Sequence, residues 1–292
     1  MKKLLFLCVI ALLAATLAAC TTQETPAASQ NNGNNGGTIM SVGPAITEIL
    51  VDLGLGHRIV ATDNFSAMVP GVPSNLEFVL DMWVPDMEAI LSVAPGTLVV
   101  TDMFSLDGVV LELLRQSGTH IVHVPQHNSI AGIVENIRFI AREMDVAPAG
   151  EALTQNMLAE IEEARQISAN ITNKRTVYFE IDPTPFTFGQ GSFMQEILEI
   201  IGAVNIFADS IPWTAIAEEQ ILAHNPDVIL TNVGWMDNAV EELKARPGWD
   251  SLYAVANSRV YLIDENTTSR DNHNIIHAMW QIARAVYPEY FN

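Results

Sequence analysis

Three histidines that lie close together in the sequence could form a metal-binding site. His120, His123 and His127 could offer imidazole nitrogens to a transition metal. The apolar pattern predicts a strand over 120–124, where His120 and His123 would point to opposite faces. Only His127, in the following loop, can then face a cleft, so we interpret the group as ordinary histidines and expect no bound metal.

Aromatic and methionine side chains follow two expected strands in the first half of the chain. Phe65 lies in the loop after a strand over 58–62, and Met103 and Phe104 follow a strand over 97–101. In open parallel sheets, ligands bind beyond the carboxyl ends of the strands. These side chains are candidate ligand contacts, although capping of the hydrophobic core would explain them equally well.

The second half of the chain has further aromatic loops. Phe186 lies in the loop 182–192, whose glycines could expose N–H groups to an anion ahead of a helix. The dinucleotide and phosphate-loop patterns are missing, so we interpret this loop as a cleft wall. Trp213 and Trp235 lie in polar loops, where an indole either offers a flat face to a ligand or anchors on its own lobe.

The first 20 residues have the pattern of an export signal. Two lysines precede the apolar run 4–13, and the sequence LAAC ends at Cys20. This ending resembles the bacterial lipobox, in which the Cys is lipidated and becomes the mature N-terminus. An ordinary secretory signal with a chance Cys is the alternative. Cys8 would be removed with the signal, so no disulfide is expected.

The remainder is an acidic, globular chain behind a polar segment. Residues 21–37 are rich in Asn and Gly, which predicts a flexible tether. Hydrophobic residues make up 49% of the 292 residues, enough for a substantial core. The net charge of −20 argues against a nucleic-acid partner.

A long helix is predicted over Pro148–Thr172. A proline suits the first turn of a helix, where its missing N–H costs nothing. The apolar residues recur at spacings of three and four, and they are Leu153, Met157, Ile161 and Ala164. A helix of about 22 residues spans roughly 33 Å, which suits a strut between two lobes.

The sequences on the two sides of this helix repeat one another. Gly43–Gly54 and Gly191–Gly202 both fit G-x4-E-I-L-x3-G. Glu88–Pro95 and Glu219–Pro226 both fit E-x-I-L-x3-P, and each runs into an apolar strand. Two matches in the same order predict two structurally similar lobes.

Strands and helices alternate in both halves, and the strands are continuously apolar. This pattern favours mostly parallel sheets covered by helices on both faces. We therefore predict an α/β fold with an N-terminal lobe over 38–147, a connecting helix over 148–172 and a C-terminal lobe over 173–292.

Several motifs resemble the cobalamin- and siderophore-type substrate-binding proteins of ABC importers, whose two lobes are joined by one long helix. The resemblance covers about residues 38–290. Its motifs are SVGPAITEILVDLGLGHRIVATD, MEAILSVAPGTLVV, VYFEIDPTPFTFGQGSFMQEILEIIGAVNIFAD, SIPW, EEQILAHNPDVIL and WDSLYAVANSRVYLID.

The resemblance implies roles for single residues. Glu88 and Glu219 match two acidic residues that dock onto basic pockets of the permease; the preference of helix N-termini for acidic residues is the alternative. Trp213 matches a Trp that stacks on cobalamin, and Arg270 falls where many relatives carry an Arg facing the cleft. Trp83 lies one residue out of register from a Trp of the cobalamin binder.

The resemblance also implies the function. We expect a monomeric, non-enzymatic receptor without a cofactor, lipid-anchored on the extracytoplasmic face of the cell membrane, that delivers a metal chelate to an ABC permease dimer. A corrinoid is the first choice because of Trp213 and the PFTFG run, and a ferric siderophore is the next. Some relatives bind haem through a Met and a His, for which Met82, Met103 and His273 are available.

Two alternatives belong to other classes of function. A secreted hydrolase would need a nucleophile or metal motif, and neither G-x-S-x-G nor H-E-x-x-H occurs. The sequence leaves open the alternative of an active site formed by two carboxylates. A surface adhesin or scaffold would have no ligand cleft.

Overall fold

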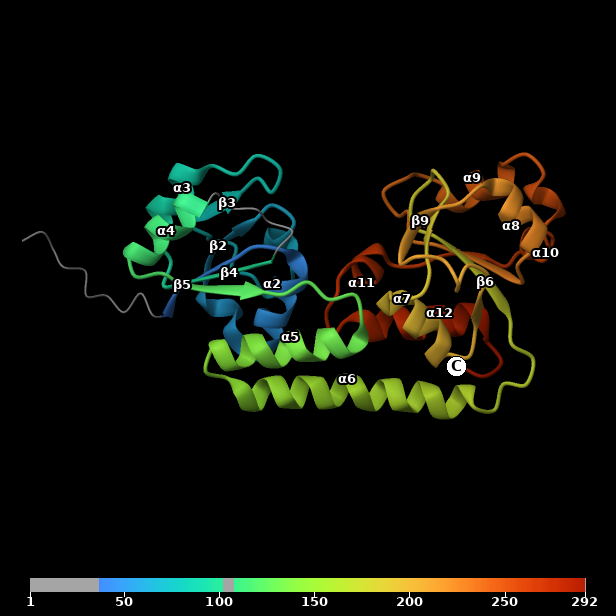
Figure 1. Ribbon diagram of the computed structural model, residues 1–292, viewed down its shortest axis with the longest axis horizontal. Helices are drawn as coiled ribbons and strands as arrows, with labels where there is room; N and C mark the ends of the chain where they lie inside the picture. Colours follow the sequence, from blue (N-terminus) through green and yellow to red (C-terminus); the bar gives the residue numbers. More distant parts are fainter. Residues whose placement is uncertain (1–36, 102–107, 292) are drawn as a thin grey trace, which may run out of the picture. The chain divides into compact units, whose positions relative to one another are not determined.

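A computed structural model describes residues 37–101 and 108–291 (Figure 1). The predicted signal segment, Cys20 and almost all of the predicted tether lie outside the described residues, as do Met103 and Phe104. In the described part of the chain, no helix combines the length and the apolar character needed to cross a bilayer.

The N-terminal lobe is built on a parallel sheet of five strands in the order β3-β2-β1-β4-β5. Its strands are β1 (Ile39–Ser41), β2 (Ile59–Asp63), β3 (Phe78–Leu80), β4 (Thr97–Thr101) and β5 (His120–Val124). Its helical segments are α2 (Pro44–Leu50), a π-helical turn (Val51–Leu55), 3₁₀ turns (Gly56–Arg58 and Ser66–Met68), α3 (Met87–Val93), α4 (Gly108–Gln116) and α5 (Ile130–Glu143). The predicted bounds of β4 and β5 are confirmed, whereas β3 was not predicted.

The C-terminal lobe has a parallel sheet of four strands in the order β11-β10-β6-β8 and a separate antiparallel pair, β7-β9. Its strands are β6 (Thr176–Glu180), β7 (Phe186–Phe188), β8 (Val204–Asn205), β9 (Trp213–Ala215), β10 (Val228–Thr231) and β11 (Val260–Leu262). Its helical segments are α7 (Phe193–Ile200), α8 (Glu218–His224), α9 (Ala239–Ala245), a 3₁₀ turn (Trp249–Ser251), α10 (Tyr253–Ala256), α11 (Glu265–Ser269) and α12 (Ile275–Val286).

The two parallel sheets share one topology, so the predicted similarity of the lobes is confirmed. The order β2-β1-β4-β5 in the first lobe corresponds to β8-β6-β10-β11 in the second. Gly54 and Gly202, the last residues of the first repeated motif, have φ of 81° and 76°, a region that favours glycine. Ala94 and Asn225 end α3 and α8 in the same left-handed conformation, each directly before a proline.

Each sheet is buried on both faces, as its continuously apolar strands predict. Val99 of β4 packs into one hydrophobic cluster, while its neighbours Leu98 and Val100 pack into another. In β10, Leu230 and Ile229 divide between two clusters in the same way. The cluster that holds Val99 also holds Leu230, so one core continues from the first lobe into the second.

The connecting helix is α6 (Ala147–Ser168), which confirms the predicted long helix but ends before the predicted Thr172. Three of the four predicted apolar residues, Met157, Ile161 and Ala164, are buried. The fourth, Leu153, is only partly buried, and its neighbour Thr154 is fully buried. Helix α6 contacts α5 and the π-helical turn of the first lobe, and α7 and α12 of the second (Figure 1). It therefore joins the two lobes, as its length suggests.

Candidate functional site

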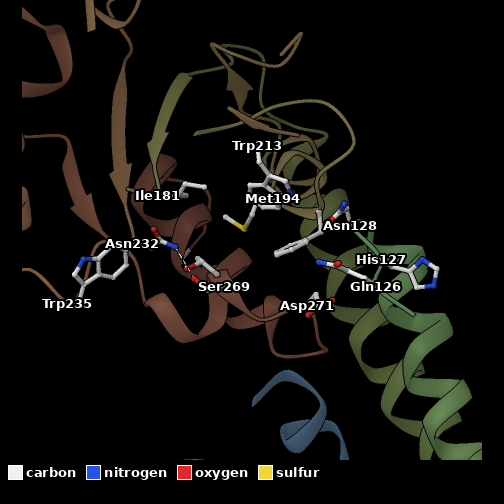
Figure 2. Close-up of a pocket in the computed structure, with 12 residues that line it drawn as sticks. Gln126, His127, Asn128, Ile181, Met194, Trp213, Asn232, Trp235, Ser269 and Asp271 are labelled. Atoms are coloured by element: carbon white, nitrogen blue, oxygen red, sulfur yellow. Dashed lines mark hydrogen bonds between the residues drawn. The ribbon is translucent and has the colours of Figure 1, made fainter. Parts of the chain in front are cut away.

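A cavity of about 290 Å³ lies at the carboxyl ends of the parallel strands, where open sheets of this kind bind ligands. Both lobes line it (Figure 2). Gln126, His127 and Asn128 follow β5 of the first lobe, and Ile181 and Asn232 follow β6 and β10 of the second. The topology of the two sheets therefore brings these loops to one place.

Trp213 forms part of the apolar wall of the cavity. Strand β9 places it opposite Phe188 of β7, and its ring meets those of Phe188 and Phe193 edge to face, with centroids 6.4 and 6.3 Å apart. Phe193 and Met194 line the cavity beside it. The expected polar loop is thus a short strand, whose pairing with β7 orients the indole.

Asn232 is an unusual polar residue in this cavity because one of its polar atoms has no partner. The side chain is 3% exposed, and its Nδ2 donates to Thr268 Oγ1 at 2.9 Å and to Ser269 Oγ at 3.3 Å. Its Oδ1 is buried without a hydrogen bond to any described residue. Buried polar atoms are nearly always hydrogen-bonded, so this oxygen is an exception within the described residues.

Asp271 brings a carboxyl group into the same cavity. Burial raises the pKa of its carboxyl, and its own backbone N–H and the charge of His127 oppose that rise. Asn232 and Asp271 were not among the predicted site residues. The only signal in the sequence was their position in polar loops around the strands of the second lobe.

The Asp271→Asn variant is expected to be more stable than the wild type at neutral pH and to lose this advantage in acid. The folded-state pKa of Asp271 lies above its ordinary value of 3.8, so the folded protein binds this proton more tightly than the unfolded chain does. Ionisation of Asp271 therefore lowers stability as pH rises through the range above 3.8. The difference in Tm between variant and wild type should grow from pH 4 to pH 7. It should stay flat for Glu163→Gln on the exposed side of α6, and a pH-independent difference for Asp271→Asn would contradict the argument.

The other predicted aromatic residues lie in different places. Trp235 lines the cavity with 55% of its surface exposed. Phe186 lies in β7, half-buried, and does not line the cavity. Phe65 and Trp83 follow β2 and β3 of the first lobe and form an edge-to-face pair with centroids 6.4 Å apart. They are 37% and 77% exposed and lie outside the lining of the cavity.

The loop that carries Phe65 is held by one buried carboxylate. Asp63, at the end of β2, is fully buried. It accepts hydrogen bonds from the N–H groups of Gly43 at 2.7 Å and of Phe65 and Ser66 at 2.9 Å, and from the Ser66 hydroxyl. The backbone that presents Phe65 at the edge of the sheet is therefore firmly positioned.

Arg270 does not line the cavity but joins the two lobes. Its guanidinium donates to Glu48 of α2 and to Asn266 Oδ1. Asn272 and Asn274 donate to the other oxygen of Glu48, at 2.5 and 3.0 Å. Four side chains from residues 266–274 thus converge on one another and on a buried carboxylate of the first lobe.

Two of the residues considered for haem binding, His273 and Met82, lie away from the cavity. His273 is 5% exposed, and its Nε2 lies 2.7 Å from Asp52 Oδ2. Met82 lies in the first lobe, where its N–H donates to Asn64 Oδ1. Neither lines the cavity.

Of the three neighbouring histidines, only His127 lies at the cavity. His120 and His123 are exposed on β5, and His120 Nε2 lies 3.0 Å from Glu143 Oε2. Over the described ranges 37–101 and 108–291, no group of three or more His, Cys, Asp or Glu side chains is placed to hold a metal ion.

Glu88 and Glu219 occupy the same position in two matching helices. Each is the second residue of a seven-residue helix, α3 in the first lobe and α8 in the second. Both side chains are exposed. The repeat in the sequence therefore corresponds to a repeat in the structure.

Comparison with known proteins agrees with this architecture. A family model described as periplasmic binding protein matches residues 39–267. The chain is 28% identical over 258 residues to the uncharacterized ABC transporter substrate-binding lipoprotein YvrC of Bacillus subtilis (strain 168), which covers 87% of this chain and 81% of that protein. It is 26% identical over 246 residues to a vitamin B12-binding protein of Vibrio cholerae, which covers 84% of this chain and 87% of that protein.

Solved structures share the fold. A possible iron-binding (periplasmic solute-binding) protein from Staphylococcus epidermidis has a TM-score of 0.76 at 24% identity, with 86% of this chain and 98% of that chain covered. The periplasmic haem-binding protein HutB of Vibrio cholerae also has a TM-score of 0.76, at 23% identity, with 87% of this chain and 100% of that chain covered. With a family model that matches most of its length and a two-lobed α/β fold joined by one long helix, this chain belongs to the periplasmic binding protein family.

Proposed function

We propose that this protein is the substrate-binding component of an ABC importer and captures a metal chelate between its two lobes. The observation that carries the proposal is the cavity at the carboxyl ends of both sheets, lined by both lobes and walled by Trp213. An apolar pocket with a few convergent polar groups is the usual form of a small-molecule site. One relative is named for substrate binding by an ABC transporter and another for vitamin B12 binding, which supports this choice of function.

A corrinoid is the proposed ligand, with a ferric siderophore or haem as the alternatives. Trp213 and Trp235 would contact it inside the cavity, and Phe65 and Trp83 would extend the aromatic surface on the first lobe. Phe186 would support the wall through the β7-β9 pair. Phe104, outside the described residues, stays a predicted contact.

Delivery of the chelate would require the protein to be held at the membrane and to dock onto the permease. Lipidation at Cys20 would hold the protein on the extracytoplasmic face of the membrane, behind the tether over 21–37. Glu88 and Glu219 would dock the two lobes, as a monomer, onto a permease dimer, because two equivalent carboxylates suit a partner with two-fold symmetry.

The Trp213→Ala variant of residues 38–292 is expected to bind the chelate about 10- to 100-fold more weakly than the wild-type fragment, because a central aromatic contact is lost. Intrinsic Trp fluorescence would be titrated with cyanocobalamin, cobinamide, haemin and ferric siderophores. Trp280→Phe removes an indole of α12 that does not line the cavity and should leave the affinity unchanged.

The same titration separates a receptor from other classes of protein. A receptor releases its ligand chemically unchanged, which chromatography of the ligand after incubation would show. Conversion of the ligand would instead indicate the hydrolase alternative. Failure of every chelate to bind the wild-type fragment would contradict the proposal.

A further inference from the structure

We propose that Glu48 and Glu196 are a reciprocal pair of positioning residues. Each binds, from its own lobe, the cavity-lining segment of the other lobe, and loss of either contact speeds release of the ligand. The effect on the ligand rests on the proposed function, since it concerns the same cavity. Neither glutamate lines that cavity itself.

The sequence repeat places the two glutamates at equivalent points of the two lobes. Each is the sixth residue of the motif G-x4-E-I-L-x3-G, counted from Gly43 in one copy and from Gly191 in the other. Glu48 lies in α2, the helix that follows β1, and Glu196 lies in α7, the first helix after β6. Strands β1 and β6 correspond in the two sheets, so the duplication of the lobes relates the two glutamates.

Each glutamate accepts hydrogen bonds from the opposite lobe, and the two donor segments are also equivalent. The donors to Glu48 are side chains of residues 270–274, directly before α12. Glu196 Oε1 accepts from the N–H of Ile130, the first residue of α5, at 3.3 Å. Helix α5 follows β5 and α12 is the long helix after β11, and these strands correspond in the two sheets. The contact made by one lobe is therefore the counterpart of the contact made by the other.

Both donor segments carry residues that line the cavity (Figure 2). These residues are Gln126, His127 and Asn128 ahead of α5, and Thr268, Ser269 and Asp271 ahead of α12. In the second segment, the side chain at position 271 lines the cavity, while those at 270 and 272 bind the first lobe. Each of these walls is thus held from the opposite lobe, and the lobes can separate only if the contact breaks.

The two contacts differ in strength. Glu48 is 9% exposed and accepts from three side chains, one of which is a guanidinium, so this contact includes a charge-assisted hydrogen bond between two ionised groups. Glu196 is half-buried and accepts from one backbone N–H of the first lobe among the described residues. The segment ahead of α5 is therefore held more weakly than the segment ahead of α12.

The separation of the lobes can be measured without a ligand. Nitroxide labels would be attached at Gln116→Cys on α4 and Glu241→Cys on α9, and the distances between them would be measured by pulsed electron spin resonance. Both positions are exposed, and residues 38–292 contain no other cysteine. The wild-type fragment is expected to give one narrow distribution of distances.

Alanine variants of the two glutamates should broaden this distribution towards longer distances. The broadening should be larger for Glu48→Ala than for Glu196→Ala, and largest when both are combined. Glu199→Ala is the matched control, because Glu199 is exposed on the same helix as Glu196 and binds Gln195 of its own lobe. It should leave the distribution unchanged.

Dissociation of cyanocobalamin, followed by Trp fluorescence in the proteins without labels, measures the effect on the ligand. Glu48→Ala should raise the dissociation rate by at least about 10-fold and Glu196→Ala by about 3-fold, with the association rate changed by less than about 2-fold. Thermal unfolding would be measured in parallel, because Glu48→Ala leaves the guanidinium of Arg270 without its carboxylate. Combining it with Arg270→Met removes both charges and keeps the test available if the single variant does not fold.

The outcomes separate this inference from the proposed function. An unchanged distribution of distances in the folded double variant would overturn the positioning role, as would a dissociation rate equal to that of Glu199→Ala. A larger effect from Glu196→Ala than from Glu48→Ala would overturn the order of the two contacts. Failure of every chelate to bind the wild-type fragment would contradict the proposed function, while the distances would still decide whether the two glutamates hold the lobes.

Discussion

Replacing Arg246 with methionine is expected to destabilise the protein by about 3–5 kcal/mol, because it leaves a buried carboxylate without its partner. Arg246 Nη1 and Nη2 lie 2.7 and 2.8 Å from the two oxygens of Glu180, whose side chain is 2% exposed. The guanidinium also lies over the Trp249 ring, 4.8 Å from its centroid. Glu180 ends β6, one residue before Ile181 of the cavity, so the pair also supports the site.

The loss of stability in Arg246→Met should depend on pH. Burial raises the pKa of Glu180 in the wild type, and the hydrogen bond and charge of Arg246 and the Tyr178 hydroxyl oppose this rise. Without Arg246 the folded-state pKa of Glu180 rises further above its unfolded value. Ionisation then costs stability as pH rises, so the deficit should be largest at neutral pH and should shrink as the solution is made acidic.

Urea unfolding at pH 5 and pH 7.5 would measure both effects. Arg115→Met is the control, because Arg115 lies 3.8 Å from Glu112 in an exposed pair, and such pairs contribute about 0–1 kcal/mol. Adding Glu180→Gln to Arg246→Met should recover part of the lost stability, since no charge is then buried without a partner. A deficit below 1 kcal/mol in Arg246→Met at neutral pH would contradict the structural argument.

Reversing the charges of Glu88 and Glu219 together is expected to abolish chelate uptake while leaving chelate binding unchanged. Each side chain is exposed, and each occupies the second position of its helix in one of two topologically equivalent lobes. A lysine at either position would face the basic pocket of the proposed permease with like charge, and such contacts cost several kcal/mol. Each single reversal should lower uptake by at least about 10-fold, and the double reversal should lower it further.

Uptake would be measured in cells whose only receptor is the variant, with binding of the purified protein titrated separately. Glu162→Lys with Glu163→Lys on the exposed side of α6 makes the same change of charge away from α3 and α8 and should support normal uptake. The two test substitutions lie in first helical turns, so they should reduce stability by only about 0.3–1 kcal/mol each. Normal uptake in the double variant would exclude these carboxylates from docking.

Local patterns were sufficient to predict most of the architecture. The spacing of apolar residues predicted α6, and the predicted bounds of β4 and β5 agree with the structure. The paired motifs around Glu88 and Glu219 predicted two related lobes, because a helix and its turn are encoded over a few consecutive residues. What was missed is short and irregular: β3, the β7-β9 pair and α11 have three to five residues each and no periodicity to detect.

The sequence predicted only part of the candidate site. Trp213 and Trp235 were expected at the ligand site, and both line the cavity. Their selection rested on residue type and on a resemblance, whereas the orientation of Trp213 depends on its pairing with β7. Asn232 had no signal of its own, because an asparagine after a strand is common and its unpartnered oxygen arises only once α11 packs beside β10.

Contacts between the two lobes depended wholly on the tertiary structure. Arg270 was expected to face the cleft, yet its guanidinium is held by Glu48, which is 222 positions away along the chain. The sequence by itself determined which segments form helices and strands and that the chain contains two copies of one topology, because those properties depend on neighbouring residues. Only the tertiary structure decided which polar side chains meet across the lobes and which side chains line the cavity, because hydrogen bonds and burial depend on distances that the order of residues does not specify.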